Sequence, residues 1–209
     1  MKDQVYCWIF FALLCFSTVT NVQAQDSLPC SPFSCVSSGM FVTAGSVLTF
    51  VPDAKAWTVD LRDAVQADGH DKLMFDNYLQ YLPAISPPIL NVCGLHSKHN
   101  LRKMIVREGA SYLLGAVLLN AAKYGFRVQR PDGTAFNSFP SGHTFTAFTG
   151  AEILRREYGK EYPWVAVAGY AVATLVGTMR VYNNRHWAGD VLAGAGLGIF
   201  SVGVVYFLF

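Results

Sequence analysis

Two stretches in the C-terminal half of the chain combine residue types that suit phosphate chemistry. Lys123 and Arg130 lie seven positions apart, and Arg180 precedes His186 and Asp190. Converging cations suit a phosphate dianion, because a guanidinium group can bind two of its oxygens at once. His186 and Asp190 are four positions apart and share a helical face, so the carboxylate can hold one imidazole nitrogen and leave the other free to attack. The spacing predicts a phosphoryl-transfer site with a histidine nucleophile.

A third stretch, Pro140-Ser141-Gly142-His143, precedes an apolar helical run over residues 144–154. Proline suits the first turn of a helix, and Ser141 and Gly142 offer a hydroxyl and unshielded backbone N–H groups at its start, which favours anion binding. His143 titrates near neutral pH and suits protonation of a leaving oxygen. Each stretch alone is common in proteins, but with Pro131, which follows Arg130, the three stretches specify ten residues in one chain, which excludes coincidence.

Four segments with almost no charge must position these residues. A helix of about 20 apolar residues crosses a bilayer, and the segments are short to adequate spans, rich in the Gly and Ala of packed membrane helices. They are residues 78–95, 104–122, 163–179 and 188–209. We expect an all-α, membrane-embedded helical bundle, and a soluble all-α bundle with buried helices is the alternative.

The composition supports a membrane or tightly packed domain and excludes other classes. Of 209 residues 52% are hydrophobic and 14% charged, against about 25% charged in an average soluble domain. A net charge of +2 without a basic stripe argues against nucleic-acid binding. The loops 96–103 and 155–161 are basic, so the positive-inside rule places both in the cytoplasm and the three chemical stretches on the opposite side.

The N-terminus resembles a secretory signal peptide over residues 1–24, with an apolar run and a small residue at Ala24. Residues 25–77 then form an expected extracytoplasmic or interfacial segment, with a surface helix or two in 53–77. For Cys30 and Cys35, a local disulfide and two free thiols both stay open. We expect Cys93 to be a packed thiol. The pair His96 and His99 lies in a polar loop and is expected to be solvated.

The three stretches resemble the type 2 phosphatidic acid phosphatase superfamily, whose pattern is K-x6-RP, PSGH and SR-x5-H-x3-D. The resemblance extends from Leu101 to the C-terminus and implies a helical domain, here residues 78–209, that hydrolyses phosphate esters through a phosphohistidine without a metal or other cofactor. It implies His186 as nucleophile, Asp190 as the group that orients it and His143 as general acid. The phosphoryl group would be held by five residues: Lys123, Arg130, Ser141, Gly142 and Arg180. Met179 departs from the pattern, because the family usually has Ser there.

The segment RPDGTAFNSFPSGHTFTAF, together with the signal peptide, resembles the Gram-negative subgroup that includes lipid A 4′-phosphatases. This implies a lipid phosphate substrate, the bacterial inner membrane and a site that faces the periplasm, without nucleic acid or an obligate protein partner. The alternatives are phosphatidylglycerophosphate or undecaprenyl diphosphate as substrate, a non-specific acid phosphatase, or a non-catalytic lipid-binding protein. The motifs bind the phosphate common to all these substrates and do not separate them.

Overall fold

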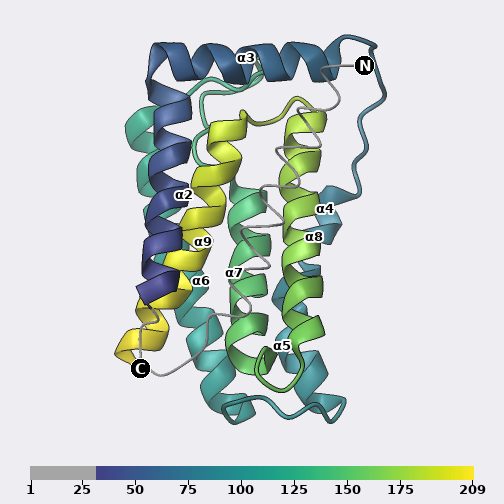
Figure 1. Cartoon of the computed structure of the whole chain (residues 1–209), viewed down its shortest axis with the longest axis vertical. Coiled ribbons are helices and arrows are strands. Elements are labelled where there is room, and N and C mark those ends of the chain that lie inside the picture. The colour runs from purple at the N-terminus through teal and green to yellow at the C-terminus, as the bar shows by residue number, and fades with distance from the viewer. Residues whose placement is uncertain (1–31) are drawn as a thin grey trace.

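A computed structural model of the chain describes residues 32–209, with side chains from Val36 onward. Within this range the regular structure is entirely helical (Figure 1). The helices are α2 (Pro32–Phe50), α3 (Pro52–Gln66), α4 (Asp76–Leu79), α5 (Leu82–Val92), α6 (Leu101–Phe126), α7 (Gly142–Tyr158), α8 (Pro163–Tyr182) and α9 (Ala188–Leu208). The expected all-α bundle is confirmed, and α5, α6, α8 and α9 coincide with the four segments of low charge. The signal-peptide and disulfide expectations lie outside the described side chains.

The long helices run side by side along the bundle, whereas α3 lies across one of its ends (Figure 1). This placement of α3 agrees with the surface helix expected in residues 53–77. The helix α2 belongs to the bundle and packs along α9. The division of the chain at residue 78 stays a prediction.

Small residues bring α2 and α9 into close contact. A Cβ atom on Gly45 would lie 2.5 Å from the backbone nitrogen of Ala193, and one on Gly196 would lie 2.8 Å from the carbonyl oxygen of Ser38. Close approach of backbones through small side chains is typical of packed membrane helices. The small residues of α2 are therefore the residues that pack it against α9.

The core lies around α7, where Phe148 contacts Tyr170 of α8 edge to face and packs with Ile199 of α9. The outer surface is also apolar: Leu113 on α6 is 68% exposed and Ile89 on α5 is 51% exposed. In the described range α8 and α9 are long and apolar enough to cross a membrane. Apolar side chains both inside and outside a bundle suit a lipid surrounding.

The two basic loops lie at the same end of the bundle, as expected. The backbone N–H of Lys98 donates to the carbonyl of Glu157 at 2.8 Å, which joins the α5–α6 connection to the end of α7. Arg155 and Arg156 lie within α7 and pair with the buried Glu152 at 2.8 and 2.7 Å, so they are structural as well as basic. The opposite end of the bundle holds α3, the α6–α7 loop and the α8–α9 turn (Figure 1).

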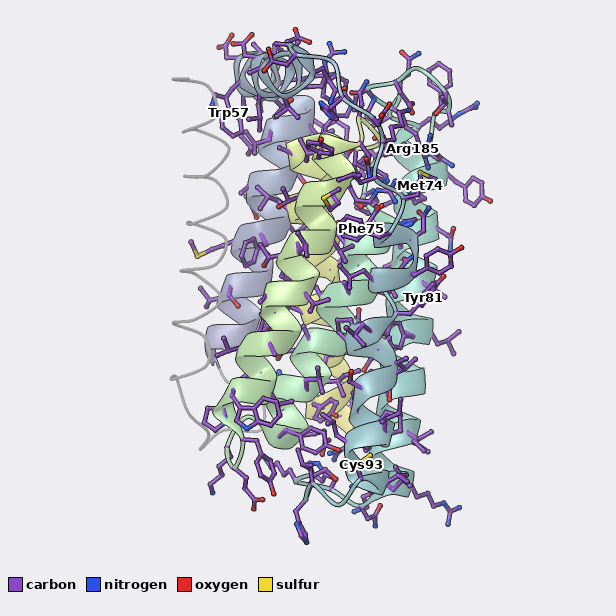
Figure 2. All side chains as sticks on the ribbon, turned by 90° about the vertical axis from the view of Figure 1, so that its right-hand side faces the viewer. Trp57, Met74, Phe75, Tyr81, Cys93 and Arg185 are labelled. Carbon is purple, nitrogen blue, oxygen red and sulfur yellow. The ribbon has the colours of Figure 1, made fainter. Side chains whose placement is uncertain are left out.

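Two minor expectations were wrong. Cys93 is an exposed free thiol, because α5 ends one residue earlier and the thiol lies beyond the packed turns; Figure 2 shows it at the end of the bundle away from Trp57 and Arg185. His99 is only partly solvated: its Nδ1 lies 3.0 Å from Glu157, and its Nε2 lies 2.8 Å from Arg107. His96 is exposed, as expected.

Candidate active site

The three chemical stretches meet at the end of the bundle that carries α3. The α6–α7 loop ends beside the start of α9, where the backbone N–H of Ser141 donates to the carbonyl of Asp190 at 2.9 Å. Gly194 lets α9 approach this point, because a Cβ atom there would lie 2.5 Å from the carbonyl oxygen of Ser141. The fold therefore joins the PSGH stretch directly to the helix that carries Asp190.

His186 is the buried centre of the site. Its Nδ1 lies 3.6 Å from Oδ2 of Asp190 and 3.4 Å from the hydroxyl of Ser138. Ser138 also donates a short hydrogen bond to Asp190, and the backbone N–H of Trp187 donates to the same carboxylate oxygen at 2.9 Å. Asp190 and Ser138 thus lie on the Nδ1 side of the ring, and Nε2 is the nitrogen left for chemistry.

The electrostatic surroundings of His186 favour its neutral form. Burial lowers the pKa of His186 below its ordinary value of 6.5, and the positive charges of Lys123 and Arg130 lower it further, whereas Asp190 acts in the opposite direction. A neutral imidazole keeps the lone pair that a nucleophile needs.

Lys123 and Arg130 are brought together by one residue that the motifs do not contain. Lys123, in the last turn of α6, donates through Nζ to the carbonyl oxygen of Asn137 at 2.5 Å, and Arg130 donates through Nε to its side-chain oxygen at 2.9 Å. Asn137 therefore anchors both cations of the first stretch next to His186.

The start of α7 has backbone N–H groups that could meet an anion. Ser141 is the residue before the helix, and no side chain caps the first-turn N–H groups. A Cβ atom on Gly142 would meet nothing within 4 Å, so open space lies beside this backbone. Ser141 is buried, and its hydroxyl oxygen accepts a hydrogen bond from Thr144 at 2.9 Å.

Arg180 and His143 are joined by α4, an element that sequence reasoning left out of the site. Nη1 of Arg180 lies 2.7 Å from the buried carboxylate of Asp76 and 3.2 Å from Oδ1 of Asn77. The same Oδ1 lies 3.0 Å from Nε2 of His143. All eight residues expected at the site thus lie at one end of the bundle, and α4 adds contacts to two of them.

The additional residues gave weak signals in the sequence. Ser138 stands two positions before Pro140, and Asp76 is an isolated charge next to an apolar segment. Neither spacing nor composition reveals that residues 73–77 fold back over α8, where Asn183 exchanges hydrogen bonds of 2.9 and 2.7 Å with the backbone of Leu73. Met179 is buried in α8 and supplies no side-chain donor in place of the usual Ser.

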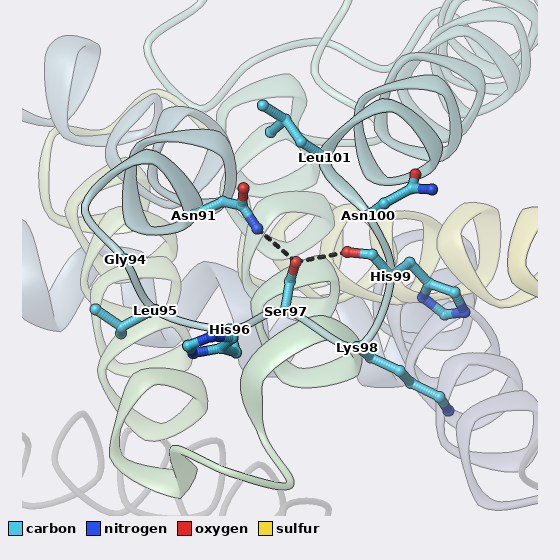
Figure 3. Close-up of a pocket in the computed structure, with 9 residues that line it drawn as sticks. All are labelled: Asn91, Gly94, Leu95, His96, Ser97, Lys98, His99, Asn100 and Leu101. Carbon is cyan, nitrogen blue, oxygen red and sulfur yellow. Dashed lines mark hydrogen bonds between the residues drawn. The ribbon is translucent and has the colours of Figure 1, made fainter.

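A cavity of about 400 Å³ lies elsewhere, in the α5–α6 connection at the opposite end of the bundle (Figure 3). Within it Asn91 donates to the hydroxyl of Ser97, which donates to the carbonyl of His99. These bonds close the turn, and the cavity is remote from His186. Among the residues that the structure describes, no group of three or more His, Cys, Asp or Glu side chains is arranged to hold a metal ion.

A helical bundle with a buried His–Asp pair among Lys and Arg side chains defines a protein of the phosphoryl-transfer class. The PAP2 superfamily model matches residues 105–209, and the chain belongs to this superfamily.

Three relatives share parts of the chain. A lipid A 1-phosphatase from Porphyromonas gingivalis is 42% identical over 159 residues, which cover 76% of this chain and 35% of that protein. A lipid A 1-phosphatase from Helicobacter pylori is 28% identical, covering 62% of this chain and 68% of that protein. An undecaprenyl-diphosphatase from Sulfolobus acidocaldarius is 33% identical, and the match covers 46% of this chain and 51% of that protein. The chain thus spans about a third of the Porphyromonas protein.

Two solved structures share the fold. The crystal structure of Aquifex aeolicus LpxE aligns with a TM-score of 0.56 at 24% identity, over 72% of this chain and 94% of that one. The transmembrane PAP2-type phosphatidylglycerolphosphate phosphatase from Bacillus subtilis aligns with a TM-score of 0.58 at 25% identity. The alignment covers 83% of this chain and 94% of that one. These likenesses agree with a membrane-embedded bundle.

Proposed function

We propose that this protein hydrolyses a phosphate monoester of a membrane lipid through a phosphohistidine intermediate. The observation that carries the proposal is the position of His186: it is buried, lies beside Asp190 and Ser138 through Nδ1, and has Lys123 and Arg130 close enough to affect its pKa. An imidazole in this setting has one nitrogen oriented and one available to attack phosphorus.

The reaction then runs in two steps. Nε2 of His186 attacks the phosphorus, the bond from phosphorus to the lipid oxygen breaks, and His143 donates a proton to that oxygen. In the second step His143 accepts a proton from water, whose oxygen attacks the phosphohistidine and releases inorganic phosphate. Asp190 stabilises the imidazole while it carries positive charge, and the Lys and Arg side chains stabilise the charge of the transferring group.

A lipid substrate follows from the surroundings of the site. The helices present apolar side chains outward, so the bundle would hold the site at a membrane surface, where lipid headgroups lie. We infer further that the site end faces the periplasm of a bacterial inner membrane, because the basic loops lie at the other end.

Within the lipids, lipid A is our proposed substrate. The sequence pattern favoured the 4′-phosphate, but the Porphyromonas and Helicobacter relatives are both named lipid A 1-phosphatases. The 1-phosphate is therefore the better supported position. Undecaprenyl diphosphate and phosphatidylglycerophosphate remain the alternatives, each supported by one similar protein.

The test is a panel of lipid phosphates offered to the purified protein in detergent, with phosphate release measured with and without EDTA. Lipid A labelled at either position, undecaprenyl diphosphate and phosphatidylglycerophosphate separate the substrates. We expect release from lipid A, unchanged by EDTA and abolished in His186→Ala, with retained folding checked by gel filtration. Turnover by His186→Ala, or dependence on a metal ion, would contradict the mechanism.

A further inference from the structure

The short helix α4 places one amide side chain between two of the residues proposed to act on the substrate. Asn77 is half-buried, and its Oδ1 lies 3.0 Å from Nε2 of His143 and 3.2 Å from Nη1 of Arg180. It is more than 60 positions away from both residues in the sequence, and no motif includes it.

The contact with Arg180 decides which way the amide of Asn77 points. A guanidinium group can only donate hydrogen bonds, so the amide atom that faces Arg180 must be the oxygen. The same oxygen faces Nε2 of His143, which must therefore carry a hydrogen. In the neutral imidazole the lone pair then resides on Nδ1, and a second proton can be gained or lost only there.

The backbone beside Asn77 is held from two sides. Asp76 is buried, pairs with Arg180 at 2.7 Å and accepts a hydrogen bond from Asn183 at 3.2 Å. Leu73 is bound to Asn183 through both backbone groups. These contacts hold residues 73–77 against α8, so the position of Asn77 is set before any substrate arrives.

From this geometry we propose that Asn77 is a positioning residue for the general acid: it holds the Nε2–H of His143, so that the proton delivered to the leaving oxygen is the one on Nδ1. As the bond from phosphorus to the lipid oxygen breaks, that proton moves to the oxygen and leaves a neutral His143 whose remaining hydrogen stays on Nε2. The inference rests on the proposed function and adds the residue that orients its acid.

The test compares two phosphate esters whose leaving groups differ in whether they need a proton to leave. p-Nitrophenolate leaves without protonation, whereas an alkoxide does not, so a misplaced general acid slows the formation of the phosphohistidine only from the alkyl ester. The comparison is made in kcat/KM, which reports this first step, because hydrolysis of the phosphohistidine is common to both substrates. We would compare p-nitrophenyl phosphate with a short-chain alkyl phosphate in wild type, Asn77→Ala, Asn77→Asp and Asn120→Ala. Asn120 is exposed on α6, and its side chain bonds only to the carbonyl of Ala116 in the described contacts, so it is the matched control.

We expect Asn77→Ala to lose about 10²-fold in kcat/KM with the alkyl phosphate, a typical value of general acid catalysis, and much less with p-nitrophenyl phosphate. Asn77→Asp keeps the acceptor oxygen, so its ratio of kcat/KM between the two substrates should stay near that of wild type. KM should rise with both substrates, because the carboxylate repels the phosphate. Asn120→Ala should match wild type throughout.

Two results would overturn the inference. An equal loss in kcat/KM with both substrates would mean that Asn77 acts only structurally. An unchanged kcat with a lower KM would mean that its amide oxygen merely occupies the position of a substrate oxygen. Wild-type protein without turnover of any phosphate ester would instead contradict the proposed function itself, so the two failures are distinguishable.

Discussion

The carboxylate of Asp190 lies 3.6 Å from Nδ1 of His186 across one turn at the start of α9. Its Oδ2 also receives hydrogen bonds from the Ser138 hydroxyl and from the backbone N–H of Trp187. These donors hold the carboxylate in place, so the carboxylate can orient the imidazole without moving itself.

Removing the charge of Asp190 should therefore cost more than removing one of its donors. Asp190→Asn keeps the shape but loses the stabilisation of imidazolium, and we expect kcat to fall about 10²–10⁴-fold. Ser138→Ala removes one hydrogen bond to the carboxylate, worth about 1.5–3 kcal/mol, and should lower kcat about 10- to 100-fold. Initial rates of phosphate release from one lipid phosphate measure the loss in each variant. Equal losses in the two variants would contradict a role for the charge.

The acid limb of the pH profile should lie below the ordinary imidazole range. His186 must be neutral to attack, and burial with the nearby cations lowers its pKa below 6.5. Activity should thus persist as the pH falls through 6.5 and disappear only below the lowered pKa. Arg130→Gln removes one of the cations and should move this limb of kcat/KM to higher pH. Because the substrate ionises identically with both proteins, a limb that does not move would contradict the assignment to His186.

The packing of α2 on α9 predicts opposite outcomes for two glycines of the same helix. A Cβ atom on Gly45 would lie 2.6 Å from the carbonyl oxygen of Gly189, whereas one on Gly39 would meet nothing within 4 Å. Gly45→Ala should destabilise the protein by about 1–3 kcal/mol through overpacking. Gly39→Ala should be neutral or stabilising by up to about 1 kcal/mol, because Ala favours helix. Thermal unfolding in detergent measures both, and equal melting temperatures would contradict this packing.

The exposed thiol of Cys93 reports which side of the membrane each end of the bundle faces. It lies at the end opposite to the site, whereas Phe136 is exposed in the α6–α7 loop beside the site. With the other cysteines replaced by Ser, an impermeant maleimide added to spheroplasts should leave Cys93 unlabelled until the membrane is permeabilised. A Phe136→Cys variant that lacks Cys93 should react from outside at once. The reverse pattern would place the site in the cytoplasm.

Much of the fold could be predicted because charge is scarce in this chain. A segment with few charges that is long enough to cross a bilayer has few alternatives to a helix, and α6, α8 and α9 follow from this. The helix α2 was missed, because Ser, Gly and Thr favour loops in water but allow close helix packing in a membrane. The position of Cys93 was misjudged for a related reason: an apolar neighbourhood in sequence does not reveal where a helix ends.

The site shows the same division between local and long-range information. The sequence by itself determined the residues of three motifs, because the parts of each motif lie close together along the chain, where their spacing can be read directly. Only the tertiary structure decided that Asn137 joins Lys123 to Arg130 and that Asn77 joins His143 to Arg180. Such contacts arise where segments that are distant in the sequence pack together. A single polar residue belongs to no periodic pattern or motif from which its partner could be predicted.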